Sequence, residues 1–141
     1  MIWMKYYNVE EEMIKNLEQN YISIVLVINE DNNQVEKKIK EIKKVLDGSF
    51  KSSEIVIVDN TTKISSLESL KSLKFKHTEI KLPIKHRTQQ ALNAGTAIAI
   101  GDYIVEIEDI SFDIDYNKII EMYKKSQEGY DFVFLTPKKS R

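Results

Sequence analysis

The 141-residue chain contains no cysteine, only two prolines, four glycines and a single tryptophan. Without cysteine it can form neither disulfides nor thiolate metal sites, and it has no thiol nucleophile. Its longest apolar run, residues 24–28, is far too short to cross a membrane. The N-terminus lacks the basic region and apolar core of a signal peptide. We therefore expect a cytoplasmic protein with no transmembrane segment.

The chain also lacks a strong charge of either sign, because 21 basic and 22 acidic residues give a formal net charge of -1. This balance gives no reason to expect nucleic acid or another polyanion as a partner. The motifs HExxH, GxSxG and GxGxxG and the P-loop are missing, which argues against zinc hydrolases, esterases, dinucleotide-dependent enzymes and ATPases. A hydrophobic share of 42% and a charged share of 30% indicate one globular domain.

Short apolar runs alternate with stretches of helical spacing along the chain. The runs predict strands over residues 21–28, 54–58, 78–82, 103–107 and 131–135. Helical spacing lies between them, over residues 35–46, 64–73, 91–98 and 119–123. This alternation predicts an α/β fold with a mostly parallel sheet and helices on both faces. Ahead of it, Val9, Met13 and Leu17 predict an amphipathic helical extension over residues 1–19, before a domain over 20–141.

Three of the predicted strands end in polar side chains. The pairs are Asn29 and Glu30, Asp59 and Asn60, and Glu108 and Asp109. Because ligands of open parallel sheets bind beyond the carboxyl ends of the strands, we expect these pairs to converge on one pocket. From the residues alone, Asp59 fits a turn or a helix cap as well as a ligand contact. Asn93 alone would be interpreted as a helix-packing residue.

Four segments together resemble the donor-binding half of family 2 glycosyltransferases, which have the GT-A fold. They are SIVLVINE (23–30), EIVIVDN (54–60), ALNAGTAIAIGDYIVEIED (91–109) and GYDFVFLTPKKSR (129–141). Their order and spacing match those of the family, and the resemblance covers about residues 20–141. It implies a Rossmann-like domain that binds a nucleoside-diphosphate sugar of the UDP-sugar type.

The resemblance also implies roles for particular residues. Asp59 would accept hydrogen bonds from the nucleobase, in the turn that it shares with Asn60. Asn29 and Glu30 would line the base and the ribose. Further along the chain, Asn93 and Gly95 would shape the helix that approaches the ribose and phosphates. Apart from the resemblance, His86 and Arg87 come just before that helix, where they could meet a phosphate together with the N–H groups of the helix N-terminus.

In the family, an Asp-x-Asp motif holds a divalent cation, manganese or magnesium, that bridges the diphosphate. Here the motif reads Glu108-Asp109-Ile110. Because isoleucine cannot ligate a metal, the resemblance leaves the cation to Glu108 and Asp109. Asp113 and Asp115 follow shortly, and their spacing fits a helix cap better than a metal site.

Two principal interpretations remain open. The chain could be the donor half of a glycosyltransferase acting on an unknown acceptor, whose acceptor half would come from further chain, from a partner chain or from a homo-oligomer. No catalytic base is identified for such a transfer. Alternatively, it could be a catalytically inactive GT-A-like binding or regulatory module, an alternative that Ile110 favours. A receiver-like signalling domain shares the alternating pattern but matches fewer residues.

Overall fold

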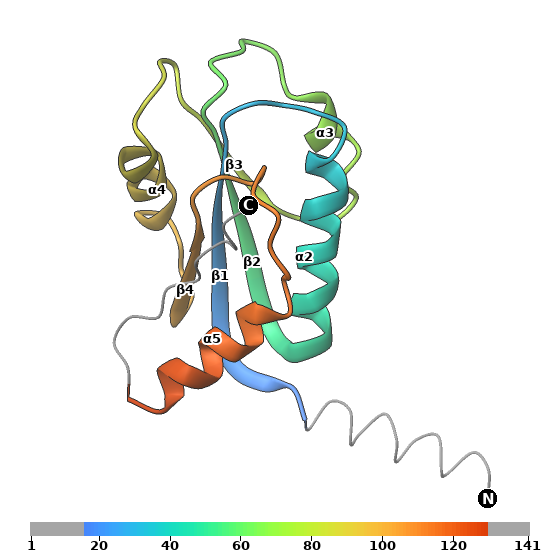
Figure 1. Ribbon diagram of the computed structural model, residues 1–141, viewed down its shortest axis with the longest axis vertical. Helices are drawn as coiled ribbons and strands as arrows, with labels where there is room; N and C mark the ends of the chain where they lie inside the picture. The colour runs from blue at the N-terminus through green and yellow to red at the C-terminus, as the bar shows by residue number, and fades with distance from the viewer. Residues whose placement is uncertain (1–15, 130–141) are drawn as a thin grey trace, which may run out of the picture.

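The computed structural model describes residues 16–129, which form a Rossmann-like α/β fold around one sheet (Figure 1). The strands are β1 (Glu18–Ile28), β2 (Phe50–Asp59), β3 (Thr78–Lys81) and β4 (Tyr103–Ile107). They lie in the order β3-β2-β1-β4, and every pair of neighbours is parallel. The predicted fold class is therefore confirmed.

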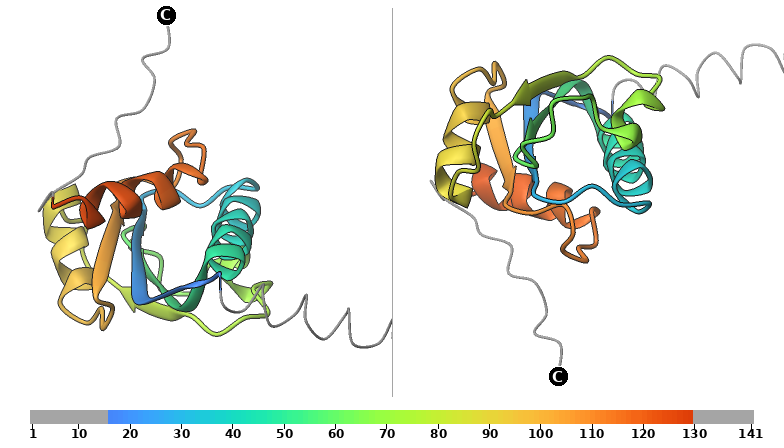
Figure 2. Two further views of the ribbon diagram at one scale, coloured as in Figure 1. Left: turned by 90° about the horizontal axis from the view of Figure 1, so that it is seen from below. Right: turned by 90° about the horizontal axis from the view of Figure 1, so that it is seen from above.

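Helices cover both faces of this sheet. They are α2 (Val35–Ser49), α3 (Glu68–Lys71), α4 (Thr88–Thr96) and α5 (Lys118–Gln127). Helix α4 lies on one side of the sheet and α2 on the other (Figure 2). Helix α5 buries Ile119 and Tyr123 in the same cluster as α2, so it covers the α2 face. None of the helices between residues 16 and 129 is long and apolar enough to span a bilayer.

Strand β1 is buried on both faces because helices cover each side of the sheet. Ile24 and Leu26 point into the large core cluster under α2 and α5, whereas Val25 and Val27 join the smaller cluster under α4. Successive side chains of a strand alternate between its two faces. A central parallel strand therefore needs an unbroken apolar run, and this is the pattern of residues 22–28 apart from Ser23.

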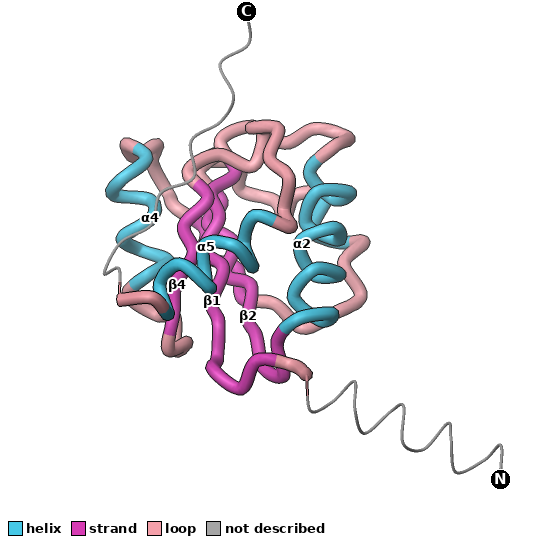
Figure 3. Tube along the Cα trace, turned by 60° about the horizontal axis from the view of Figure 1, so that its bottom comes forward, coloured by secondary structure: helices cyan, strands magenta, loops and turns pink. Residues whose placement is uncertain are grey.

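The register of the sheet brings the carboxyl ends of its strands to one edge. Ile28 pairs with Asp59, and Asp59 pairs with Lys81. On the other side of β1, Leu26 pairs with Ile107, and the Ile110 N–H donates to the Val27 carbonyl at 3.0 Å. The loops that follow the strands gather above this edge (Figure 3). We call it the carboxyl edge of the sheet.

Several boundaries differ from the predictions, most clearly in the helices. The helix expected over residues 64–73 is reduced to α3, and Ile64 is 99% exposed, because the polar stretch from Thr61 to Ser66 forms a loop. Ile98 was expected in the buried stripe of α4 but is 45% exposed, since the helix ends at Thr96. Helix α2 continues to Ser49, beyond the helical spacing predicted over residues 35–46.

Two further predictions concern the ends of the chain. Most of the expected extension over residues 1–19 and the expected strand over 131–135 lie outside the described residues. Glu18 and Gln19, which were assigned to the extension, already belong to β1.

Candidate functional site

Side chains from three strand ends meet at the carboxyl edge. The Asn29 amide, after β1, donates to Asp109 Oδ2, after β4, at 3.1 Å. The Asn60 amide, after β2, donates to Asn29 Oδ1 at 2.8 Å. The predicted convergence of these three polar clusters is thus confirmed by direct hydrogen bonds. Glu30 and Glu108 belong to the same loops, but their side chains are exposed.

Asn60 fixes the loop that leads into α4. It is fully buried, its amide also donates to the His86 carbonyl at 2.9 Å, and its Oδ1 accepts the His86 N–H at 3.0 Å. Both amide hydrogens and the amide oxygen are therefore used within the protein. Asn60 holds residues 85–87 over the ends of β1 and β2, which makes it a positioning residue for that loop.

Asp59 combines a turn contact with an unpaired oxygen. Its Oδ1 accepts hydrogen bonds from the Thr61 N–H at 2.9 Å and the Thr61 hydroxyl at 2.6 Å. Its Oδ2 is buried and has no hydrogen-bond partner among residues 16–129. The residue as a whole is 2% exposed. Oδ1 thus stabilises the turn that the sequence predicted as one role of Asp59, and Oδ2 can accept a hydrogen bond from a further donor.

The turn that follows Asp59 has a strained backbone. Thr62 adopts a φ of 67°, in the left-handed region that β-branched residues rarely occupy. Such conformations cost on the order of 1–3 kcal/mol and gather at ligand sites and moving loops. The strain lies three residues after the unpaired carboxylate oxygen.

Asp109 is held by several partners at the end of β4. Its Oδ1 accepts the Ser111 N–H at 2.8 Å, while Oδ2 accepts the Asn29 amide. Burial alone would raise the pKa of Asp109, but the hydrogen bonds from Ser111 and Asn29 and the positive charge of Lys85 outweigh it and lower that pKa. The carboxylate is therefore ionised and already surrounded by donors.

The donor set around Asp109 does not fit a divalent cation. Ile110 is 1% exposed and belongs to the core cluster under α2 and α5. Within residues 16–129, no three acidic or histidine side chains gather closely enough to hold a metal. Asp113 pairs with Lys38 at 3.3 Å. Asp115 Oδ1 accepts the Asn117 N–H at 3.1 Å in the turn before α5, whereas the N-cap residue of α5 is Asn117 and makes no side-chain cap hydrogen bond.

Lys85 is a neighbour of this edge that the sequence did not single out. Its ammonium donates to the Asn29 carbonyl at 3.4 Å, and its charge acts on Asp109. Arg87, two residues later, is exposed and directly precedes α4. In the sequence, only its position directly before His86 and Arg87 indicated that Lys85 could lie near the site.

Asn93 and Gly95 lie on different sides of α4. Asn93 is exposed and its Oδ1 accepts the Gln89 amide at 2.9 Å. Gly95 is buried against the sheet, where a Cβ would lie 2.4 Å from Val25 Cγ1. The close approach that this glycine allows is therefore the approach of α4 to the sheet.

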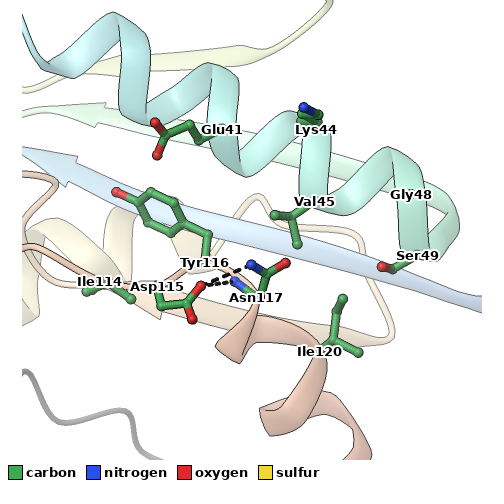
Figure 4. A pocket seen from close by; sticks show the side chains of 10 residues that line it. All are labelled: Glu41, Lys44, Val45, Gly48, Ser49, Ile114, Asp115, Tyr116, Asn117 and Ile120. Atoms are coloured by element: carbon green, nitrogen blue, oxygen red, sulfur yellow. Dashed lines mark hydrogen bonds between the residues drawn. The ribbon is translucent and has the colours of Figure 1, made fainter.

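A separate hollow of about 530 Å³ lies between α2 and residues 114–120 (Figure 4). It includes Tyr116, whose pKa is raised to about 12 by burial and by the charges of Glu41 and Asp113. The Tyr116 hydroxyl has no hydrogen-bond partner among the described residues. None of the predicted site residues lines this hollow. We therefore take the carboxyl edge as the candidate site.

Comparison with known proteins supports the resemblance found in the sequence. Residues 22–140 match the family model described as glycosyl transferase family 2. Comparison with curated proteins gives no match. The matched region includes all the residues of the carboxyl edge described above. Membership implies a glycosyltransferase-type function with a nucleotide-sugar donor, and the family often uses a divalent cation. The chain thus belongs to glycosyl transferase family 2.

Proposed function

We propose that the chain binds a nucleoside-diphosphate sugar of the UDP-sugar type at the carboxyl edge and presents it for transfer to an acceptor. The unpaired Asp59 Oδ2 is the observation that carries this proposal. A buried polar atom without a partner is unfavourable, and one that survives in a folded protein calls for a ligand or another explanation. The N–H group of a pyrimidine ring is a suitable donor to a carboxylate oxygen.

Because Oδ2 is shielded from solvent, a ligand reaches this oxygen only when the residues around it shift. Because release of the strain at Thr62 would offset part of the cost, we expect the shift to occur in residues 61–62, after the anchored Asn60. Relief of that strain and the new hydrogen bond would both favour the bound form. The proposal therefore includes a small movement of this turn when the nucleotide binds.

The other predicted residues take their places around this contact. Asn29 and Glu30 follow β1 beside Asp59 and would line the base and ribose, with Asn60 holding their geometry. Arg87 and the N-terminus of α4 would face the phosphates, while Asn93 presents an exposed amide on the same helix. Gly95 contributes indirectly, by letting α4 lie close to the sheet.

Calorimetric titration with UDP and GDP tests the proposal. We expect UDP to bind and Asp59→Asn to weaken that binding by about tenfold or more, because the substitution can replace the accepting oxygen with an amide donor. Asp102→Asn is the matched control, since Asp102 accepts the Tyr21 N–H at the opposite edge of the sheet. The assignment fails if neither nucleotide binds, or if the two variants bind UDP equally well.

A second candidate function is a binding module that does not transfer sugar. It is favoured by Ile110, which is buried and stands where the family has the second aspartate of its acidic motif. Release of UDP from a UDP-sugar, measured with and without a pool of acceptor sugars, separates the two functions. Turnover that Asp59→Asn abolishes would support transfer. UDP binding without turnover would support the module.

A further inference from the structure

The oxygen atoms of Asp109 are engaged, which bears on how this site would neutralise a diphosphate. Oδ1 accepts the Ser111 N–H at 2.8 Å, and Oδ2 accepts the Asn29 amide at 3.1 Å. Asn29 cannot turn away freely, because its own Oδ1 accepts the buried Asn60 amide at 2.8 Å. A cation that took Asp109 as a ligand would have to share its two oxygens with these donors.

The neighbouring positions do not offer the ligands that such a cation needs. Ile110 faces the core and its N–H is bonded to Val27, so the backbone around it is fixed. Glu108 directly follows β4, and its side chain is exposed to solvent. Magnesium requires near-octahedral oxygen coordination, and manganese also favours octahedral oxygen sites, which a lone hydrogen-bonded carboxylate supports poorly.

A positive charge already occupies this neighbourhood. The Lys85 ammonium donates to the Asn29 carbonyl at 3.4 Å and interacts electrostatically with Asp109. Its loop is tied to the sheet through both hydrogen bonds between Asn60 and the His86 backbone. A divalent cation beside Asp109 would therefore meet the like charge of Lys85, whose chain neighbour His86 is held by Asn60.

Lys85 also lies where phosphates would be bound. The loop that carries it continues through His86 and Arg87 into α4, a nine-residue helix whose first N–H groups favour anions. Lysine binds phosphate as a compact positive charge. We propose that this site holds the diphosphate of its nucleotide without a divalent cation, with Lys85 as the counter-charge. This inference rests on the proposed nucleotide site.

The experiment is a calorimetric titration of the full chain with UDP and with uridine, in EDTA and then in manganese. We expect UDP affinity to agree within about twofold between the two conditions. Lys85→Gln should weaken UDP binding by about tenfold while leaving uridine binding nearly unchanged, since uridine has no phosphate. Lys44→Gln is the control, because Lys44 is an exposed lysine that lines the separate hollow by α2.

Three other results would contradict different parts of the proposal. UDP binding that requires manganese would overturn the inference and leave the proposed nucleotide site intact. UDP binding that Lys85→Gln does not change, or an equal loss of uridine and UDP affinity in that variant, would overturn the role of Lys85. If neither uridine nor UDP binds in either condition, the nucleotide site itself is refuted, and this inference falls with it.

Discussion

Gly95→Ala tests the packing that places α4 and the loop before it. The added Cβ would lie 2.4 Å from Val25 Cγ1 and 2.9 Å from Val58 Cγ2. Carbon atoms in favourable contact are about 3.5–4.0 Å apart, so α4 and the sheet would have to separate by roughly 1 Å. Both valines are buried in the cluster under α4, which leaves them little room to move.

The expected loss of stability follows from two opposing effects. Overpacking of this kind costs about 1–3 kcal/mol. In a helix interior, alanine stabilises the helix relative to glycine by up to about 1 kcal/mol, and this gain is smaller at position 95, near the end of α4. The clash should prevail, giving a net loss of about 1–2 kcal/mol and a fall in Tm of roughly 3–8 °C.

Urea denaturation of Gly95→Ala and Gly48→Ala provides the matched comparison. Gly48 lies in the last turn of α2, where an added Cβ would meet nothing within 4 Å beyond its chain neighbours and the backbone of its own helix. Gly48→Ala should therefore stabilise the chain, by about 0.5–1 kcal/mol. In a Val25→Ala background the cost of Gly95→Ala should shrink, because one clashing methyl is gone. A Gly95→Ala protein as stable as the wild type would refute the packing argument.

Three further predictions concern stability. Asn60→Ala should cost about 2–4 kcal/mol in urea denaturation, because it leaves the His86 backbone groups and the Asn29 oxygen without their partner; a loss below about 1 kcal/mol would contradict this. Tyr116→Phe should be neutral or stabilising by up to about 1 kcal/mol. The Tyr116 pKa is raised to about 12 in the folded chain, so the free energy of unfolding of the wild type should fall as the pH rises from about 10 towards 12. If the Tyr116→Phe protein shows the same fall, Tyr116 is not its cause. Folding lowers the pKa of Asp109, so the ionised carboxylate stabilises the fold above its unfolded pKa of about 4, and this stabilisation is lost as the pH falls through the folded pKa. In acid-unfolding curves, Asp109→Asn should therefore lose less stability than the wild type as the pH falls. Identical curves for the two proteins would contradict this prediction.

Much of the sheet could be predicted because its signals are local. A buried parallel strand needs a continuous apolar run, and residues 24–28 and 55–58 show one on the printed sequence. The strand ends carry polar residues, and the rule that these ends meet at one edge predicted that Asn29, Asn60 and Asp109 would come together.

The parts that escaped prediction depend on contacts between distant segments. The position of Lys85 is set by Asn60, which ties a loop 26 residues away to the sheet. Likewise, the need for glycine at position 95 comes from valines on two strands. The spacing of Ile64, Leu67, Leu70 and Leu73 suggested a longer helix, but the loop from Thr61 to Ser66 leaves Ile64 in solvent. Periodicity reports which side chains are apolar, and tertiary contacts decide which of them are covered.

The most direct test of the central claim is to map a UDP titration onto the backbone by ¹H–¹⁵N NMR. We predict that the largest chemical-shift perturbations fall in residues 28–31, 59–62 and 84–88. Residues around the separate hollow, such as Glu41, Tyr116 and Ile120, should change little. Changes centred on that hollow, or no changes at saturating UDP, would contradict a nucleotide site at the carboxyl edge.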